Sequence, residues 1–143
     1  MKPGYGRAIR GIFILILAAA VYAGAQATYQ PKFPGDPAHS DSEAAALGYM
    51  RTLLRAQHLY NKKNGKYASS LADLVHTGTF TRRMVNTDRG DYSVSFQPHK
   101  DGFDLLLTPK QLDTEHRSFY AKEDGVIRAE EDKAANESSP KLK

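Results

Sequence analysis

AQHLYNKKNGKYASSLADLV, residues 56–75, is the stretch that decides the fold. Its first half completes an amphipathic helical pattern. Asn64-Gly65 then provides a stop, because glycine adopts the left-handed conformation of a helix cap without steric cost. Ser69-Ser70 precedes LADLV and can cap a second, short helix that ends near Gly78. The stretch therefore predicts a long helix, a tight turn and a short helix, in that order.

The long helix is expected over residues 42–64. Ser40 and Glu43 have the three-residue spacing of a capping box. At about 100° per residue, one face of this helix is largely apolar. That face consists of Ala46, Tyr49, Met50, Leu53, Leu54, Gln57 and Tyr60. The opposite side carries Arg51, Arg55, His58 and Lys62, which we interpret as a solvated face.

After Gly90 the hydrophobic period changes from helical to alternating. Tyr92, Val94 and Phe96 alternate with polar residues, which predicts a strand with one buried face. Residues 103–108 predict a second strand, and residues 117–121 and 126–129 a further hairpin, while residues 77–90 read as a loop. The expected fold is α+β, with an amphipathic helix packed on an antiparallel β-meander of about four strands. The predicted core comprises Tyr49, Met50, Leu53, Leu54, Tyr60, Leu71, Leu74, Val94, Phe96, Phe103, Leu105, Leu107, Phe119 and Ile127.

Two segments flank this expected domain, which spans residues 42–129. Residues 28–41 contain Pro31, Pro34 and Pro37, and prolines disfavour helix at the residues before them. We therefore expect an extended, proline-rich linker there. Residues 130–143 are charged, small and polar, which is typical of a disordered tail.

The amino terminus, residues 1–27, has the parts of an export signal. Lys2, Arg7 and Arg10 precede an apolar run, and Ala25 and Ala27 have the spacing of small residues that signal peptidase requires for cleavage after Ala27. Residues 11–30 are also uncharged and about long enough to cross a bilayer as a retained anchor. In both cases the remainder is exported, either to the periplasm or cell exterior or held outside the inner membrane.

Gly11 offers an alternative processing site. A short basic leader that ends in glycine before an apolar helix resembles a prepilin leader. Type IV pilins carry a glutamate a few residues after that glycine, whereas residues 12–16 here read IFILI. The processing residues expected from the sequence are therefore Ala25 and Ala27, with Gly11 as the alternative.

Composition excludes several functions. Three of the 20 Lys and Arg residues precede the apolar run, which leaves 17 against 16 Asp and Glu, so no nucleic-acid partner is expected. The absence of cysteine rules out disulfides and thiolate chemistry. The histidines are dispersed and no nucleophile–base set can be assembled, so we expect no catalytic residues, metal, cofactor or small-molecule substrate.

Residues 86–91 have oxygen-bearing side chains at alternate positions, but the segment favours a turn over a calcium-binding loop. Tyr60 and Tyr67 flank three lysines, which indicates packing across the helix-ending turn more than ligand stacking.

Residues 43–129 resemble the globular part of type IV pilins and type II secretion pseudopilins. The resemblance rests on Gln57–Val75 and on the phrase RSFYAKEDGVIRAE, residues 117–130. It implies a pilin-like head and a non-enzymatic structural or interaction role, with envelope or secretion-system proteins as partners. If the amino terminus is uncleaved, residues 11–30 hold the protein in the membrane. The alternative is a small exported domain that binds a carbohydrate, peptide or metal and has no link to filaments.

Overall fold

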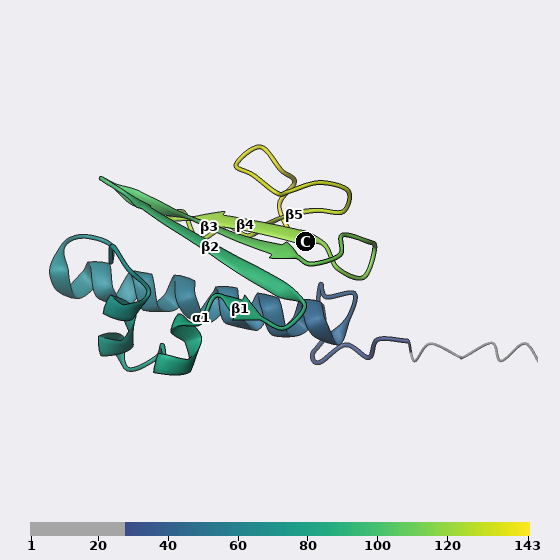
Figure 1. Cartoon of the computed structure of the whole chain (residues 1–143), viewed down its shortest axis with the longest axis horizontal. Helices are drawn as coiled ribbons and strands as arrows, with labels where there is room; N and C mark the ends of the chain where they lie inside the picture. Colours follow the sequence, from purple (N-terminus) through teal and green to yellow (C-terminus); the bar gives the residue numbers. More distant parts are fainter. Residues whose placement is uncertain (1–27) are drawn as a thin grey trace, which may run out of the picture.

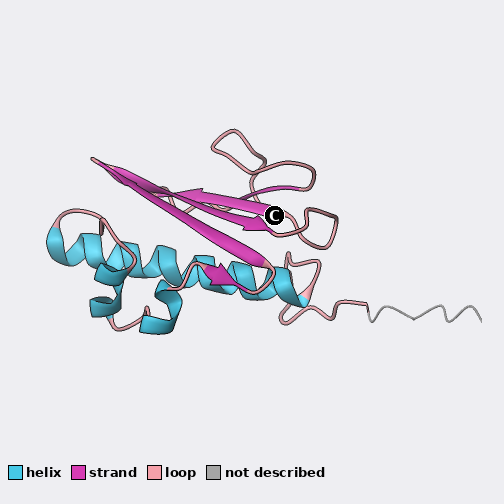
Figure 2. Ribbon diagram, in the orientation of Figure 1, coloured by secondary structure: helices cyan, strands magenta, loops and turns pink. Residues whose placement is uncertain are grey.

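The computed structural model describes residues 28–143, which form one long helix and a five-stranded antiparallel sheet (Figures 1 and 2). The fold is therefore α+β, as predicted. The helices are α1 (Asp41–Asn64) and two short 3-10 helices, η1 (Ala72–Thr77) and η2 (Arg82–Val85). The strands are β1 (Asp88–Arg89), β2 (Tyr92–His99), β3 (Gly102–Pro109), β4 (Ser118–Lys122) and β5 (Arg128–Glu130).

Both ends of α1 are capped as the sequence predicts. Ser40 is extended (φ −151°), and its side-chain oxygen accepts a hydrogen bond from the amide of Glu43 at 3.1 Å. At the other end Gly65 has φ 70°, and its amide donates to the carbonyl of Asn61. The expected second helix is η1, but its N-cap residue is Leu71 and not a serine. Ser70, one residue earlier, still accepts a hydrogen bond from the Asp73 amide at 3.2 Å, and Gly78 ends the helix in the left-handed conformation.

The strands follow one another along the sheet in the order β1-β2-β3-β4-β5. In β2 the buried residues Tyr92 and Val94 alternate with exposed serines, as the period of two predicts. The segment 77–90 is more structured than the expected loop, because it contains η2 and β1. The short strand β1 adds a fifth strand through pairing with Tyr92 and Ser93 of β2.

The core lies between α1 and one face of the sheet (Figure 1). Ten of the fourteen predicted core residues are buried, and Leu54, Tyr60, Phe96 and Ile127 pack against them partly buried. Gln57 is buried within this core and makes two hydrogen bonds to Ala68, one to its carbonyl at 3.2 Å and one from its amide at 2.9 Å. These two hydrogen bonds fix the chain after the Gly65 turn against α1.

The linker is a compact turn and not the extended segment that its prolines predict. The carboxylate of Asp36 accepts hydrogen bonds from the Tyr29 hydroxyl at 2.5 Å and from the amides of Lys32 and Ala38. Ala38 is buried against the core. One aspartate therefore gathers residues 29–38 into a fixed entry to α1.

Residues 130–143 also differ from expectation, because they fold onto the sheet instead of forming a disordered tail. The amide of Ala129 donates to the Pro140 carbonyl and the amide of Leu142 to the Ile127 carbonyl, so residues 140–142 run beside β5. Ala135 is buried, and its amide donates to the Ser118 hydroxyl at 2.9 Å. Figure 1 shows the loops of this segment on the side of the sheet away from α1, whereas Leu142 at its end packs against the core. This segment is ordered although it is mostly charged and polar, because residues of the sheet form hydrogen bonds with its backbone.

Candidate functional site

The start of α1 and the residue before β4 are joined by a buried ion pair. The carboxylate of Glu43 is fully buried and accepts three hydrogen bonds from Arg117, from its amide at 2.8 Å, its Nε at 3.0 Å and one terminal nitrogen at 2.8 Å. The other hydrogen-bond partners extend the pair into the linker. The amide of His39 donates to Glu43 at 2.8 Å, and Arg117 donates to the Pro37 carbonyl at 2.6 Å. The pair therefore ties the linker, the helix and the sheet together.

Tyr92 supports the same junction from within the core. Its hydroxyl donates to the carbonyl of Arg117 at 2.9 Å. Burial, with the nearby Glu43 carboxylate, raises the pKa of Tyr92 above its usual range. Tyr92 therefore remains a neutral donor. The backbone of Arg117 is fixed by two contacts, its carbonyl by Tyr92 and its amide by Glu43.

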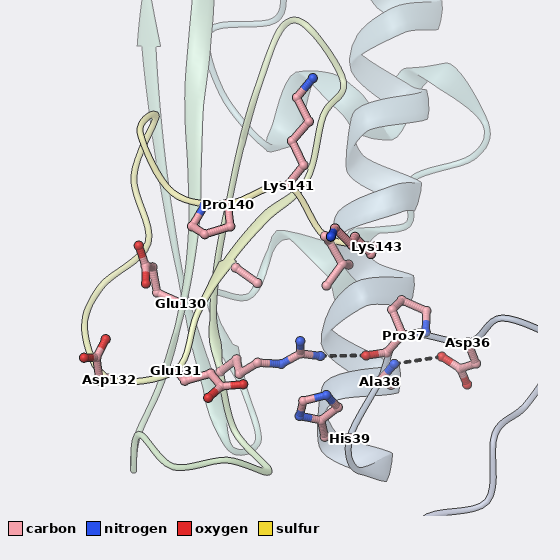
Figure 3. A pocket seen from close by; sticks show the side chains of 13 residues that line it. Asp36, Pro37, Ala38, His39, Glu130, Glu131, Asp132, Pro140, Lys141 and Lys143 are labelled. Carbon is pink, nitrogen blue, oxygen red and sulfur yellow. Dashed lines mark hydrogen bonds between the residues drawn. The ribbon is translucent and has the colours of Figure 1, made fainter.

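A cleft of about 760 Å³ opens beside this junction (Figure 3). Figure 3 shows Pro37, Ala38 and His39 on one side of it, with Glu130, Glu131 and Asp132 across from them. The full lining is Asp36, Pro37, Ala38, His39, Arg117, Ala129, Glu130, Glu131, Asp132, Pro140, Lys141, Leu142 and Lys143. The cleft exists because the linker turn and the carboxyl-terminal segment both fold back onto the ends of α1 and β5.

The cleft carries charges of both signs. Carboxylates come from the linker and from residues 130–132, and cations from Arg117, Lys141 and Lys143. His39 has its ring fixed by a 2.7 Å contact between Nδ1 and the Thr114 carbonyl. Such a lining suits a polar or peptide-like ligand that bears both charges.

Asp36 forms the linker wall of the cleft. Its hydrogen bond from the Tyr29 hydroxyl, with that from the Lys32 amide, lowers the pKa of the Asp36 carboxyl below its usual range. Burial and the same Asp36 contact raise the pKa of Tyr29 to about 12. The two groups therefore stay in the protonation states that hold the turn together.

Several residues that the sequence analysis considered as possible ligand-binding residues take part in turns, ion pairs or core packing. Asp88, in the oxygen-rich segment 86–91, accepts from Lys110 Nζ at 3.1 Å, and Gly90 turns the chain with φ 71°. Tyr67 packs edge-on against Phe103, with ring centroids 5.4 Å apart. Tyr60 is partly buried against the core. Among residues 28–143, no group of three His, Asp or Glu side chains is placed to hold a metal ion.

The predicted processing residues lie outside the described part of the chain. This holds for Ala25 and Ala27 and for the alternative, Gly11. Within residues 28–143, no helix is both long enough and apolar enough to cross a membrane.

Sequence reasoning missed the central pair of this region. Glu43 reads as the third helical residue of a capping box, and Arg117 as the start of a strand. A partial signal was present, because a glutamate at that helix position points back toward the preceding loop. No local pattern could name its partner, which lies 74 residues away.

Comparison of the chain with models of known protein families, with curated proteins and with solved structures finds no match.

Proposed function

We propose that this chain is a non-enzymatic, exported protein of the bacterial envelope whose pilin-like domain has a structural or interaction role linked to a type II secretion or type IV pilus-like system. Support comes from the long helix laid along an antiparallel meander and from the basic, then apolar amino terminus. The domain acts as a head on an export segment or tether. It is not a subunit of a continuous helical spine.

The observation that carries this proposal is the fixed start of α1. Ser40 is extended and caps the helix, and the Glu43–Arg117 pair holds the first turn against β4. The Asp36 turn then redirects the chain before Ser40. A helix that begins in this way does not continue into the apolar residues upstream, whereas a pilin spine requires one uninterrupted helix.

The two edges of the sheet also support the proposal, because neither offers a long free strand to which another copy of the domain could pair. The outer edge of β5 is covered by residues 140–142. At the other edge β1 pairs only with Tyr92 and Ser93, and Pro98 further along β2 has no amide to donate. Strand addition is therefore blocked at β5 and limited at the β1–β2 edge.

Amino-terminal sequencing of the protein from its native host tests the proposal. We expect a mature chain that begins at Thr28, or an intact Met1 if the segment is retained as an anchor. Ala27→Leu should block cleavage because signal peptidase requires a small residue there. The matched variant Gly11→Leu should leave processing unchanged. A chain that begins at Ile12, and whose processing is lost in Gly11→Leu, contradicts the proposal and restores a filament role.

The neighbouring genes provide a second test of the link to secretion. Genes for a prepilin peptidase or a secretion ATPase beside this one would support it. Their absence would favour the second candidate function, a small exported ligand-binding domain.

The mixed-charge cleft is the observation that supports this second candidate. A thermal-shift screen with charged peptides and oligosaccharides would test it. A ligand of the cleft should raise the unfolding temperature of the wild type and not of Glu131→Gln, whose side chain lines the cleft and is exposed. The exposed variant Glu123→Gln, outside the cleft, provides the control. Equal shifts in both variants would place binding elsewhere.

A further inference from the structure

Phe33 is the one large hydrophobic side chain that is exposed among residues 28–143, with 47% of its surface accessible. It belongs to the linker turn, close behind the apolar stretch 11–27. A turn held by three hydrogen bonds to Asp36 presents this ring to solvent. This ring therefore adds exposed apolar surface at the entry to the domain.

The ring borders a hollow of about 410 Å³ with a distinct chemical character. Its apolar lining includes Phe33, Ile127 and Leu142, and its charged lining is Arg51, Lys141 and Lys143. No acidic side chain is among the residues that line it. We call these six residues the Phe33 surface.

One cation of this surface, Arg51, lies over the aromatic ring. The guanidinium carbon of Arg51 lies 5.8 Å from the centroid of the Phe33 ring. Lys32, next to Phe33, is paired with Asp41 at 2.6 Å, so its charge is balanced. Asp36 is near enough to Arg51 for the cation to contribute to its lowered pKa. Lys141 and Lys143 therefore supply most of the positive charge of this surface, and the same two lysines also line the neighbouring cleft that contains Glu130, Glu131 and Asp132.

We propose that the Phe33 surface contacts a bilayer with anionic headgroups, the membrane through which the chain is exported. This inference rests on the proposed function in its anchored form, in which residues 11–30 are retained and keep the domain at that membrane. Residues 28–36 enter at the end of the domain where this surface lies, away from the β2–β3 hairpin (Figure 1). An aromatic ring with long cationic side chains matches the interface, where rings sit at headgroup level and cations reach anionic groups.

Each component is weak by itself. One aromatic ring provides little binding, and each Lys or Arg near an anionic surface strengthens contact by roughly fivefold. A segment held in the membrane raises the effective concentration of the domain at the surface, so a weak contact is sufficient. The expected contact is therefore reversible and sensitive to salt.

The chain contains no tryptophan, so one introduced tryptophan reports on a single position. The full chain carrying Phe33→Trp is reconstituted in vesicles of phosphatidylcholine and phosphatidylglycerol with brominated acyl chains. The control is His99→Trp, at the exposed turn of the β2–β3 hairpin. We expect strong quenching of the indole fluorescence in Phe33→Trp and little quenching in His99→Trp. Equal quenching in the two variants, or none in Phe33→Trp, overturns the proposal.

Charge variants in the Phe33→Trp background test the electrostatic part. Lys141→Gln should weaken the contact roughly fivefold, and Arg51→Gln should weaken it by less, because Asp36 lies near Arg51. The matched change Lys62→Gln, an exposed cation in the last turn of the same helix, should have no effect. Quenching that is unchanged in these variants and in vesicles of phosphatidylcholine alone overturns the proposal. Circular dichroism verifies that each variant is folded.

The membrane contact and the proposed export can fail independently, and the experiments distinguish the two failures. An exported Phe33→Trp chain whose fluorescence is not quenched overturns the membrane contact and leaves the export proposal intact. A chain that fractionates with the cytoplasm overturns the proposed function, whatever the vesicles show.

Discussion

The carboxylate of Glu43, in the first turn of α1, accepts three hydrogen bonds from Arg117, which lies 74 residues later and directly precedes β4. Nothing between them in the sequence requires this approach. The pair is almost fully withdrawn from water, with side-chain exposures of 0% and 10%. It sets the position of the helix start relative to the sheet.

Removal of one partner should therefore be costly. Glu43→Ala leaves the Arg117 charge buried and unpaired, and we expect a loss of about 3–5 kcal/mol in the free energy of unfolding, measured by urea denaturation. Asp41→Ala removes an exposed carboxylate of the same helical turn and should cost less than about 1 kcal/mol. Replacing both Glu43 and Arg117 by leucine should cost less than the single change. Similar losses for Glu43→Ala and Asp41→Ala would show that the pair contributes little.

Leu53 and Leu54 provide a matched test of the core. Leu53 is fully buried between α1 and the sheet, and Leu54 is only partly buried. Leu53→Ala should lower the free energy of unfolding by about 2–5 kcal/mol, because it removes methylenes and leaves a cavity. Leu54→Ala should cost clearly less. The reverse order in chemical denaturation would mean that the face of α1 toward the core is misassigned.

Tyr49 should make stability depend on alkaline pH. Its hydroxyl donates to the Met84 carbonyl, and burial raises its pKa to about 12 from the usual 10.0. Because the folded pKa is raised, the stabilisation by the neutral phenol is complete below pH 10 and is lost as the pH rises toward 12. The stability advantage of wild type over Tyr49→Phe should therefore shrink over that range. Thermal unfolding at stepped pH measures it, and a constant difference would contradict the raised pKa.

Hydrogen exchange should distinguish an ordered carboxyl-terminal segment from a disordered one. The amides of Ala129, Ala135 and Leu142 each donate a hydrogen bond and should exchange slowly. Residues 132–134 are exposed and should exchange fast. Leu142→Ala should increase exchange at Ala129, because Leu142 packs against the core beside β5. Fast exchange throughout residues 131–143 would restore the disordered tail that the composition predicts.

The sequence was sufficient for features that depend on neighbours along the chain. Ser40 and Glu43 marked the start of α1, Gly65 marked its end, and the alternation from Tyr92 marked β2, because caps and periodicity act within a few residues. The order of helix, short helix and meander followed from the same local signals. So did most of the core, because burial of one helix face and one sheet face follows from the periods 3.6 and 2.

The tertiary structure decided the features that need distant partners. Three features differ from local expectation or have no local signal. They are the Glu43–Arg117 pair, the Asp36 turn in a proline-rich linker, and the carboxyl-terminal segment that is ordered against the sheet. Composition describes how a segment behaves without partners, and residues 130–143 have few apolar side chains of their own. Once the sheet is formed, Ser118 and Ile127 offer them hydrogen-bonding groups at fixed positions. Those positions exist only after the chain has folded, which is why the sequence pattern could not reveal them.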